Sequence, residues 1–126
     1  MIPEGYVESK LNRLEHVVSD IIAMEDPDDM MLAVTETLSE TEVVPDVGKY
    51  YTFIYAPKTP RIRYDQFPLI ACVDLFRWGF RGMNYHWGGD FRNYTWNEVL
   101  GNLHVAYPME MEDLRSIPYQ NFKINI

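Results

Sequence analysis

Apolar positions at the start of the chain repeat at helical spacing. Steps of four and three residues alternate, which places the apolar side chains on one face of a helix. The spacing predicts a helix over residues 4–24, ending where the sequence EDPDD begins. A helix of this length is marginally stable alone in water, so its stripe needs another surface to cover it. The stripe consists of Val7, Leu11, Leu14, Val18 and Ile21.

A second helix is predicted directly after this break. Asp26 is suited to cap its N-terminus, and Pro27 suits its first position. The two aspartates that follow favour the positive end of the helix dipole. The helix is expected to end near Ser39, and its apolar stripe consists of Met31, Val34 and Leu38, with Met30 beside it.

From residue 50 onward the pattern changes to that of strands. Residues 50–55 (YYTFIY) alternate and are rich in β-forming side chains. Residues 69–78 are apolar enough for a central strand. Gly79 permits a tight reversal at positive φ, and residues 80–87 form the return strand. Gly82 within that strand indicates a bulge or a close backbone contact.

Turn signals assign the remaining segments. Prolines predict a loop over residues 56–68, and GGDFRN (88–93) predicts a second turn. Thr95 followed by Glu98 matches a capping box, which predicts a short helix over residues 96–103. Further helical turns are expected after Pro108, and a closing strand is expected near the C-terminus, with three candidates for burial: Tyr119, Phe122 and Ile124.

These elements predict an α+β fold. Four strands with short helical insertions favour a small curved antiparallel sheet or an SH3-like β-barrel, preceded by an acidic N-terminal helical extension. Composition supports a division near residue 46. Residues 1–46 hold 12 acidic and 2 basic residues, whereas residues 47–126 hold 7 acidic and 9 basic residues and 17 of the 18 aromatic residues. We therefore expect an acidic helical extension (1–46, one or two helices) and an aromatic-rich β module (47–126).

The first stripe has two interpretations. Either it packs on the β module or on the second helix, or it binds a partner chain, in which case its five residues form the partner-binding set. The acidic side chains form a solvated face. With a net charge of −8 they disfavour nucleic acid, because like charges repel the phosphates.

The sequence lacks the usual catalytic and metal-binding motifs. Its three histidines are far apart, no H-x-x-x-H or C-x-x-C spacing occurs, and no phosphate-binding loop is present, so no metal site and no cofactor are expected. The single Cys72 lies in apolar surroundings that disfavour a thiolate, and it excludes an intramolecular disulfide. No apolar run is long enough to span a membrane, and the N-terminus does not resemble a signal peptide.

Three polar residues are the candidates for chemistry. Asp65 precedes an aromatic–proline corner, where aspartate commonly accepts backbone N–H groups in a turn. Asn84 and His86 alternate on the predicted return strand and so share a face. They either brace the Asp65 loop or line a ligand groove. A small enzyme built around this groove is the alternative to a non-catalytic protein.

Basic residues of the β module are interspersed with aromatic ones. Such a set suits single-stranded nucleic acid or a DNA end. It equally suits an acidic protein surface, including the acidic helix of a neighbouring copy, and the negative net charge favours this second option. The set forms a possible secondary interface consisting of Arg61, Arg63, Arg77, Arg81 and Arg92.

Three motifs are similar to those of small virion proteins of T4-like contractile-tailed phages, cyanophages among them: GKYYTFIYAPKT, RYDQFPLI and WGFRGMNYHW. The resemblance covers about residues 48–90. It implies a structural, non-catalytic protein of the tail baseplate or neck, assembled in the host cytoplasm, whose partners are other virion proteins or copies of itself. It implies framework roles for Tyr64, Asp65, Phe67, Pro68, Gly79, Gly82, Asn84 and His86.

Overall fold

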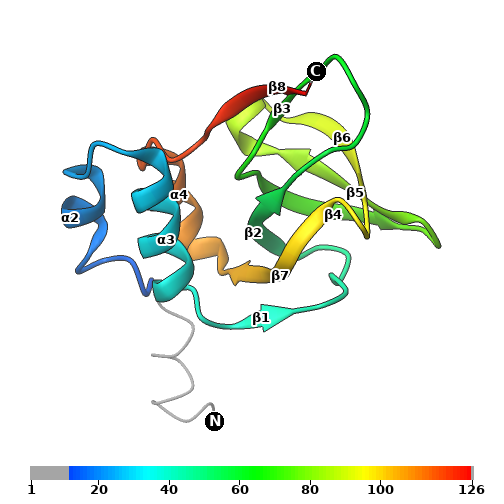
Figure 1. Ribbon diagram of the computed structural model, residues 1–126. Helices are drawn as coiled ribbons and strands as arrows, with labels where there is room; N and C mark the ends of the chain where they lie inside the picture. The colour runs from blue at the N-terminus through cyan, green and yellow to red at the C-terminus, as the bar shows by residue number, and fades with distance from the viewer. Residues whose placement is uncertain (1–11, 126) are drawn as a thin grey trace, which may run out of the picture.

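The computed structural model describes residues 12–125, which form an α+β protein (Figure 1). An antiparallel sheet contains, in spatial order, β1 (Thr41–Glu42), β7 (Val99–Ala106), β2 (Tyr50–Tyr55), β4 (Leu69–Leu75), β5 (Gly79–Asn84) and β6 (Asp90–Thr95). A separate antiparallel pair consists of β3 (Ile62–Asp65) and β8 (Phe122–Asn125). The helical elements are α2 (Val18–Ile22), α3 (Pro27–Thr37) and α4 (Met111–Ser116), with 3₁₀ turns η1 (Tyr85–Trp87) and η2 (Pro108–Glu110).

The six-stranded sheet is open. Its edges are β1 and β6, which do not pair with each other in the described part of the chain. The α+β class and the antiparallel sheet are confirmed, but the closed SH3-like barrel is wrong. The reason is the path of the chain after β6. The next strand, β7, does not pair with β6 but with β2 and β1, toward the opposite edge of the sheet. The two-residue β1 at that edge does not pair with β6, so no barrel is closed.

Two glycines hold β5 close to its neighbours. Gly79 does not adopt the positive φ that we expected. Instead, a Cβ at this position would collide with the carbonyl oxygen of Tyr94 on β6. At Gly82 a Cβ would lie 2.9 Å from the Cβ of Ile70, so the expected close contact is confirmed. The bulge lies opposite, on β4, where Val73 is the extra residue.

The capping-box interpretation of Thr95 and Glu98 is wrong. These residues lie in the tight turn between β6 and β7. There the backbone N–H of Glu98 donates to the carbonyl oxygen of Thr95 at 3.1 Å, and the Thr95 hydroxyl donates to the Glu98 carboxylate. The same three-residue spacing therefore stabilises a turn that leads from β6, at one edge of the sheet, to β7, which pairs with β2 and β1. The residues that follow form β7 because β2 supplies a pairing partner that local sequence does not reveal.

Other segments are partly as predicted. Strand β2 has the predicted bounds, β4 begins at the predicted residue, and helical turns follow Pro108. The predicted loop over 56–68 contains β3, and most of the predicted second turn belongs to β6. In the closing strand, Ile124 is 64 % exposed, so its predicted burial is wrong, whereas Tyr119 is buried as expected.

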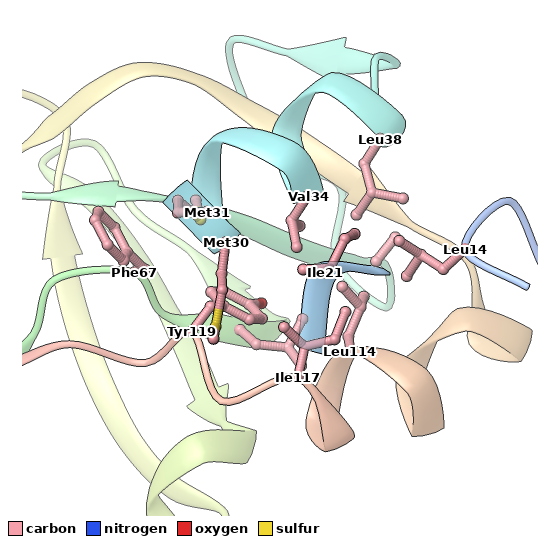
Figure 2. Packing of buried hydrophobic residues seen from close by; sticks show 12 residues of the cluster. Leu14, Ile21, Met30, Met31, Val34, Leu38, Phe67, Leu114, Ile117 and Tyr119 are labelled. Carbon is pink, nitrogen blue, oxygen red and sulfur yellow. The ribbon is translucent and has the colours of Figure 1, made fainter. Parts of the chain in front are cut away.

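The helices and one face of the sheet share a hydrophobic core (Figure 2). Asp26 caps α3 as predicted, because its side chain accepts the backbone N–H of Asp28 at 2.9 Å. The stripe predicted for this helix is buried. The core contains Leu14, Ile21, Met30, Met31, Val34, Leu38, Phe67, Leu69, Ala106, Leu114, Ile117 and Tyr119.

The opposite face of the sheet carries a second, aromatic cluster. Alternation along β2 sends Tyr50 and Ile54 toward the helices, and Tyr51, Phe53 and Tyr55 to the other side. The second cluster contains Tyr51, Phe53, Tyr55, Ile70, Cys72, Phe80, Tyr94, Leu103 and Val105. None of the helices formed by residues 12–125 is long and apolar enough to cross a bilayer.

Candidate functional site

A buried polar network joins β3, β5 and η1. Asp65 accepts the backbone N–H of Phe67 at 3.1 Å and the amide of Asn84 at 3.4 Å, and its Oδ2 lies 2.6 Å from Nδ1 of His86. Oδ1 of Asn84 accepts the backbone N–H groups of His86 (2.7 Å) and Trp87 (3.2 Å), which caps η1. The expected turn role of Asp65 is confirmed, and so is the bracing of its loop.

The route to this contact differs from the predicted one. β5 ends at Asn84, and His86 lies in η1, so the two residues are not alternating positions of one strand. They meet Asp65 because the cap of η1 turns the imidazole back toward β3. The predicted contact with Asp65 is therefore confirmed, but the shared strand face predicted for Asn84 and His86 is wrong.

The network is built as a brace. Asp65 and Asn84 are each 1 % exposed, and both oxygens of the Asp65 carboxylate have donors. Because a carboxylate only accepts, Nδ1 of His86 carries the proton in this pair. An Asp–His pair also orients general bases and metal ligands. Asp65 and Asn84 are buried away from any recess, whereas His86 lines two surface recesses, so only the imidazole of this network borders space that a ligand could enter.

Other candidate groups for chemistry are separate. Nδ1 of His104 lies 2.7 Å from the carbonyl oxygen of Leu38, far along the chain from the Asp65 network. Burial raises the pKa of the Cys72 thiol, which disfavours the reactive thiolate. Within residues 12–125, His, Cys, Asp and Glu side chains do not gather in any group of three that could hold a metal ion.

The predicted helical stripe is divided by the structure. Val7 and Leu11 lie outside the described residues. Leu14 and Ile21 are buried in the chain's own core, and Val18 is partly buried against it (Figure 2). Of the two interpretations of the stripe, packing within the chain is the one that the positions of Leu14 and Ile21 support.

A buried ion pair holds this segment in place. The carboxylate of Glu110, at the end of η2, is 0 % exposed. It accepts hydrogen bonds from Nε and Nη2 of Arg13, each at 2.8 Å. The same carboxylate accepts the backbone N–H groups of Arg13 and Tyr107. Sequence reasoning missed this pair because its partners are 97 residues apart.

The arginines of the predicted secondary interface fall into two groups. Arg63 and Arg92 are neighbours, since Nη1 of Arg92 donates to the carbonyl oxygen of Arg63 at 3.1 Å. Arg77 and Arg81 lie at the end of the β4–β5 hairpin. Arg61, directly before β3, is exposed. Within residues 12–125 it makes no direct contact with either group that the structure records.

The first group borders a recess that we call the Arg63 recess. Its volume is about 340 Å³, and its lining consists of Arg63, His86, Trp87 and Phe122. The guanidinium of Arg63 lies 5.1 Å from the centre of the Phe122 ring, and that of Arg92 lies 5.4 Å from the Trp87 ring. Trp87 was not singled out from the sequence, and Phe122 was named only as a candidate for burial. The available signal was the occurrence of aromatic residues next to basic ones.

The second group lies on a surface that we call the hairpin end, residues 75–81. Phe76 and Trp78 stack with ring centres 4.7 Å apart, and Arg81 lies 5.3 Å from the Phe76 ring. Trp78 is 43 % exposed and Leu75 is 40 % exposed. Figure 1 shows this hairpin extending away from the helices. The carbonyl of Arg77 accepts the indole N–H of Trp96 at 2.7 Å, which ties the tip to the sheet.

Comparisons of this chain with protein-family models, with curated proteins and with solved structures find no match.

Proposed function

We propose that this chain is a non-catalytic structural or assembly protein of a phage particle, located in the tail baseplate or the neck. Its β module docks to neighbouring virion proteins. The sequence support is the similarity of three motifs to small virion proteins of T4-like phages. The structural support is the hairpin end, an exposed aromatic and arginine surface on a braced hairpin.

The hairpin end is the observation that carries the proposal. Tryptophan and arginine are enriched among the residues that dominate binding energy in protein interfaces, and bulk charge is depleted there. Trp78 is held in a stack with Phe76, so little side-chain freedom is lost when a partner covers it. The proposal places docking here and not on Leu14 and Ile21, because the chain's own core covers those side chains.

The polar network supports the same role. Asp65, Asn84 and His86 fix the junction between β3 and η1, and so hold the sheet and the two-stranded pair together. A rigid framework that presents an exposed surface suits assembly, since little of the binding energy is lost to ordering the protein.

The first test is whether the protein is part of the particle. Virions purified by density gradient should contain the chain in a fixed copy number relative to the major tail proteins, measured by quantitative mass spectrometry. Its absence from intact, infectious particles would overturn the proposal.

The second test addresses the hairpin end. We expect Trp78→Ala to reduce incorporation into particles at least about tenfold, because a central aromatic anchor contributes about 2 kcal/mol or more to an interface. The matched control is Leu32→Ala on α3, whose side chain is 59 % exposed and lies outside the hairpin end. Both variants should melt within a few degrees of the wild type. Equal incorporation of the two variants would contradict docking through the hairpin end.

A further inference from the structure

We infer that the Arg63 recess binds a carboxylate from an acidic segment of a partner chain. This inference rests on the proposed docking role for the identity of the partner. The binding itself is a property of the isolated protein. The recess is distinct from the hairpin end and uses the other pair of arginines.

The first observation is an unpaired donor. Nε1 of Trp87 is buried and has no hydrogen-bond partner among the described residues. An indole N–H only donates, so the group that satisfies it must be an acceptor. Buried polar groups are nearly always paired in folded proteins, and an unpaired one is destabilising. Because Trp87 lines the recess, we place the missing acceptor there.

The second observation is positive charge without an ion-paired carboxylate. Neither Arg63 nor Arg92 forms a salt bridge with residues 12–125. Burial raises the pKa of Glu98, but its hydrogen bonds and the charge of Arg92 outweigh this effect and lower it. The lining of the recess contains no carboxylate. Asp65 lies behind His86, at 2.6 Å from Nδ1, and its oxygens are occupied. An anion in the recess would meet a guanidinium and an N–H donor without facing a competing negative group.

The lining of the recess suits a single side chain. Trp87 and Phe122 have ring centres 5.4 Å apart at 35° and form apolar walls. A volume of about 340 Å³ is at the lower end of the range for ligand pockets, enough for a glutamate or aspartate side chain. Arginine forms parallel hydrogen bonds with carboxylates, which gives such a contact direction as well as charge.

His86 also lines the recess. Its Nδ1 is held by Asp65, and its Nε2 is buried without a partner among the described residues.

A protein carboxylate fits better than a nucleic-acid phosphate. Nucleic acid brings a dense row of negative charges toward a chain whose net charge is −8, and long-range repulsion weakens such binding. A single carboxylate on a folded partner needs only the local positive potential of Arg63 and Arg92.

Nuclear magnetic resonance tests the site directly. Each tryptophan gives one indole N–H signal, and this chain has three tryptophans: Trp78, Trp87 and Trp96. Titration with sodium acetate, at constant ionic strength against sodium chloride, should shift the Trp87 signal downfield. The Trp96 signal is the internal control, because its N–H already donates to the carbonyl of Arg77. An unmoved Trp87 signal, or equal shifts of Trp87 and Trp96, would overturn the inference.

The source of the anion is tested with an acetylated tetraglutamate amide and a single-stranded thymidine oligonucleotide. We expect the peptide to bind more tightly than acetate, and Trp87→Phe and Arg63→Gln to weaken it about tenfold each. Trp96→Phe should leave the affinity unchanged. Tighter binding of the oligonucleotide than of the peptide would overturn the choice of a protein partner. If the recess binds the peptide but the chain is absent from virions, the carboxylate site is supported and the proposed role in the particle is overturned.

Discussion

At the scale of single residues, stability depends on a few buried polar contacts. The Glu110 carboxylate is fully buried and accepts four hydrogen bonds, from Arg13 and from the backbone of Tyr107. Burial lowers the pKa of Arg13, but its hydrogen bond and charge interaction with Glu110 outweigh this effect and raise it. Arg13 therefore keeps its positive charge beside the Glu110 carboxylate.

Glu110→Gln tests this pair. The amide keeps the shape but leaves the Arg13 guanidinium without its counter-charge, so we expect the free energy of unfolding to fall by about 3 kcal/mol. The matched control is Lys49→Gln, which removes an exposed pair with Glu42 and should change stability by less than about 1 kcal/mol. Urea denaturation measures both. Similar losses in the two variants would show that burial does not strengthen the Glu110 pair.

At the scale of elements, β5 is the strand on which the sheet depends most. It pairs with β4 on one side and β6 on the other, and its glycines allow both neighbours to come close. The two glycines are not equivalent. A Cβ at Gly79 meets backbone of β6, which cannot move without breaking the ladder. A Cβ at Gly82 meets the Cβ of Ile70 at 2.9 Å, a milder overlap that a smaller shift of the strands relieves.

The expected outcome is a graded loss of stability. Gly82→Ala should lower the free energy of unfolding by about 1–2 kcal/mol, whereas Gly79→Ala should cost about 3 kcal/mol or more, because overpacking against backbone forces the strands apart. Soluble yield and urea denaturation of the two variants measure the difference. If Gly79→Ala were as stable as the wild type, the close approach of β5 to Tyr94 would be incorrect.

At the scale of the whole molecule, the two hydrophobic clusters lie on opposite faces of one sheet. Leu14 belongs to the cluster under the helices and Cys72 to the aromatic cluster. β2, β4 and β7 contribute side chains to both, so the helical segment from residue 14 and the sheet are joined through shared strands. We expect them to unfold as one unit.

Labelling of Cys72 reports this coupling. The thiol is buried, and burial raises its pKa, so it should react with a thiol reagent only when the sheet opens. Leu14→Ala removes a fully buried side chain from the other cluster and should destabilise the protein by about 3 kcal/mol. In a single cooperative unit the labelling rate of Cys72 then rises about a hundredfold. An unchanged rate would show that the helical segment and the β module unfold separately.

The sequence by itself determined the elements whose signals are local. Asp26 and Pro27 define the start of α3, and the spacing of its apolar residues defines the buried face. The alternation in YYTFIY defines β2 and sends its side chains to two faces. Asp65 before an aromatic–proline corner indicated its turn role. In each case the stabilising contact lies within a few residues, so the pattern carries the information.

Only the tertiary structure decided the features that depend on distant partners. Thr95 and Glu98 form a turn and not a helix, because the residues after them pair as β7 with β2, and β7 begins 44 residues after β2 ends (Tyr55 to Val99). Arg13 contacts Glu110 although 97 residues separate them, and Trp87 contacts Phe122 although 35 residues separate them (122 − 87). The sheet stays open because β7 returns beside β2 and leaves β6 at an edge. These outcomes are set by pairing and packing energies between segments, which local propensity does not encode.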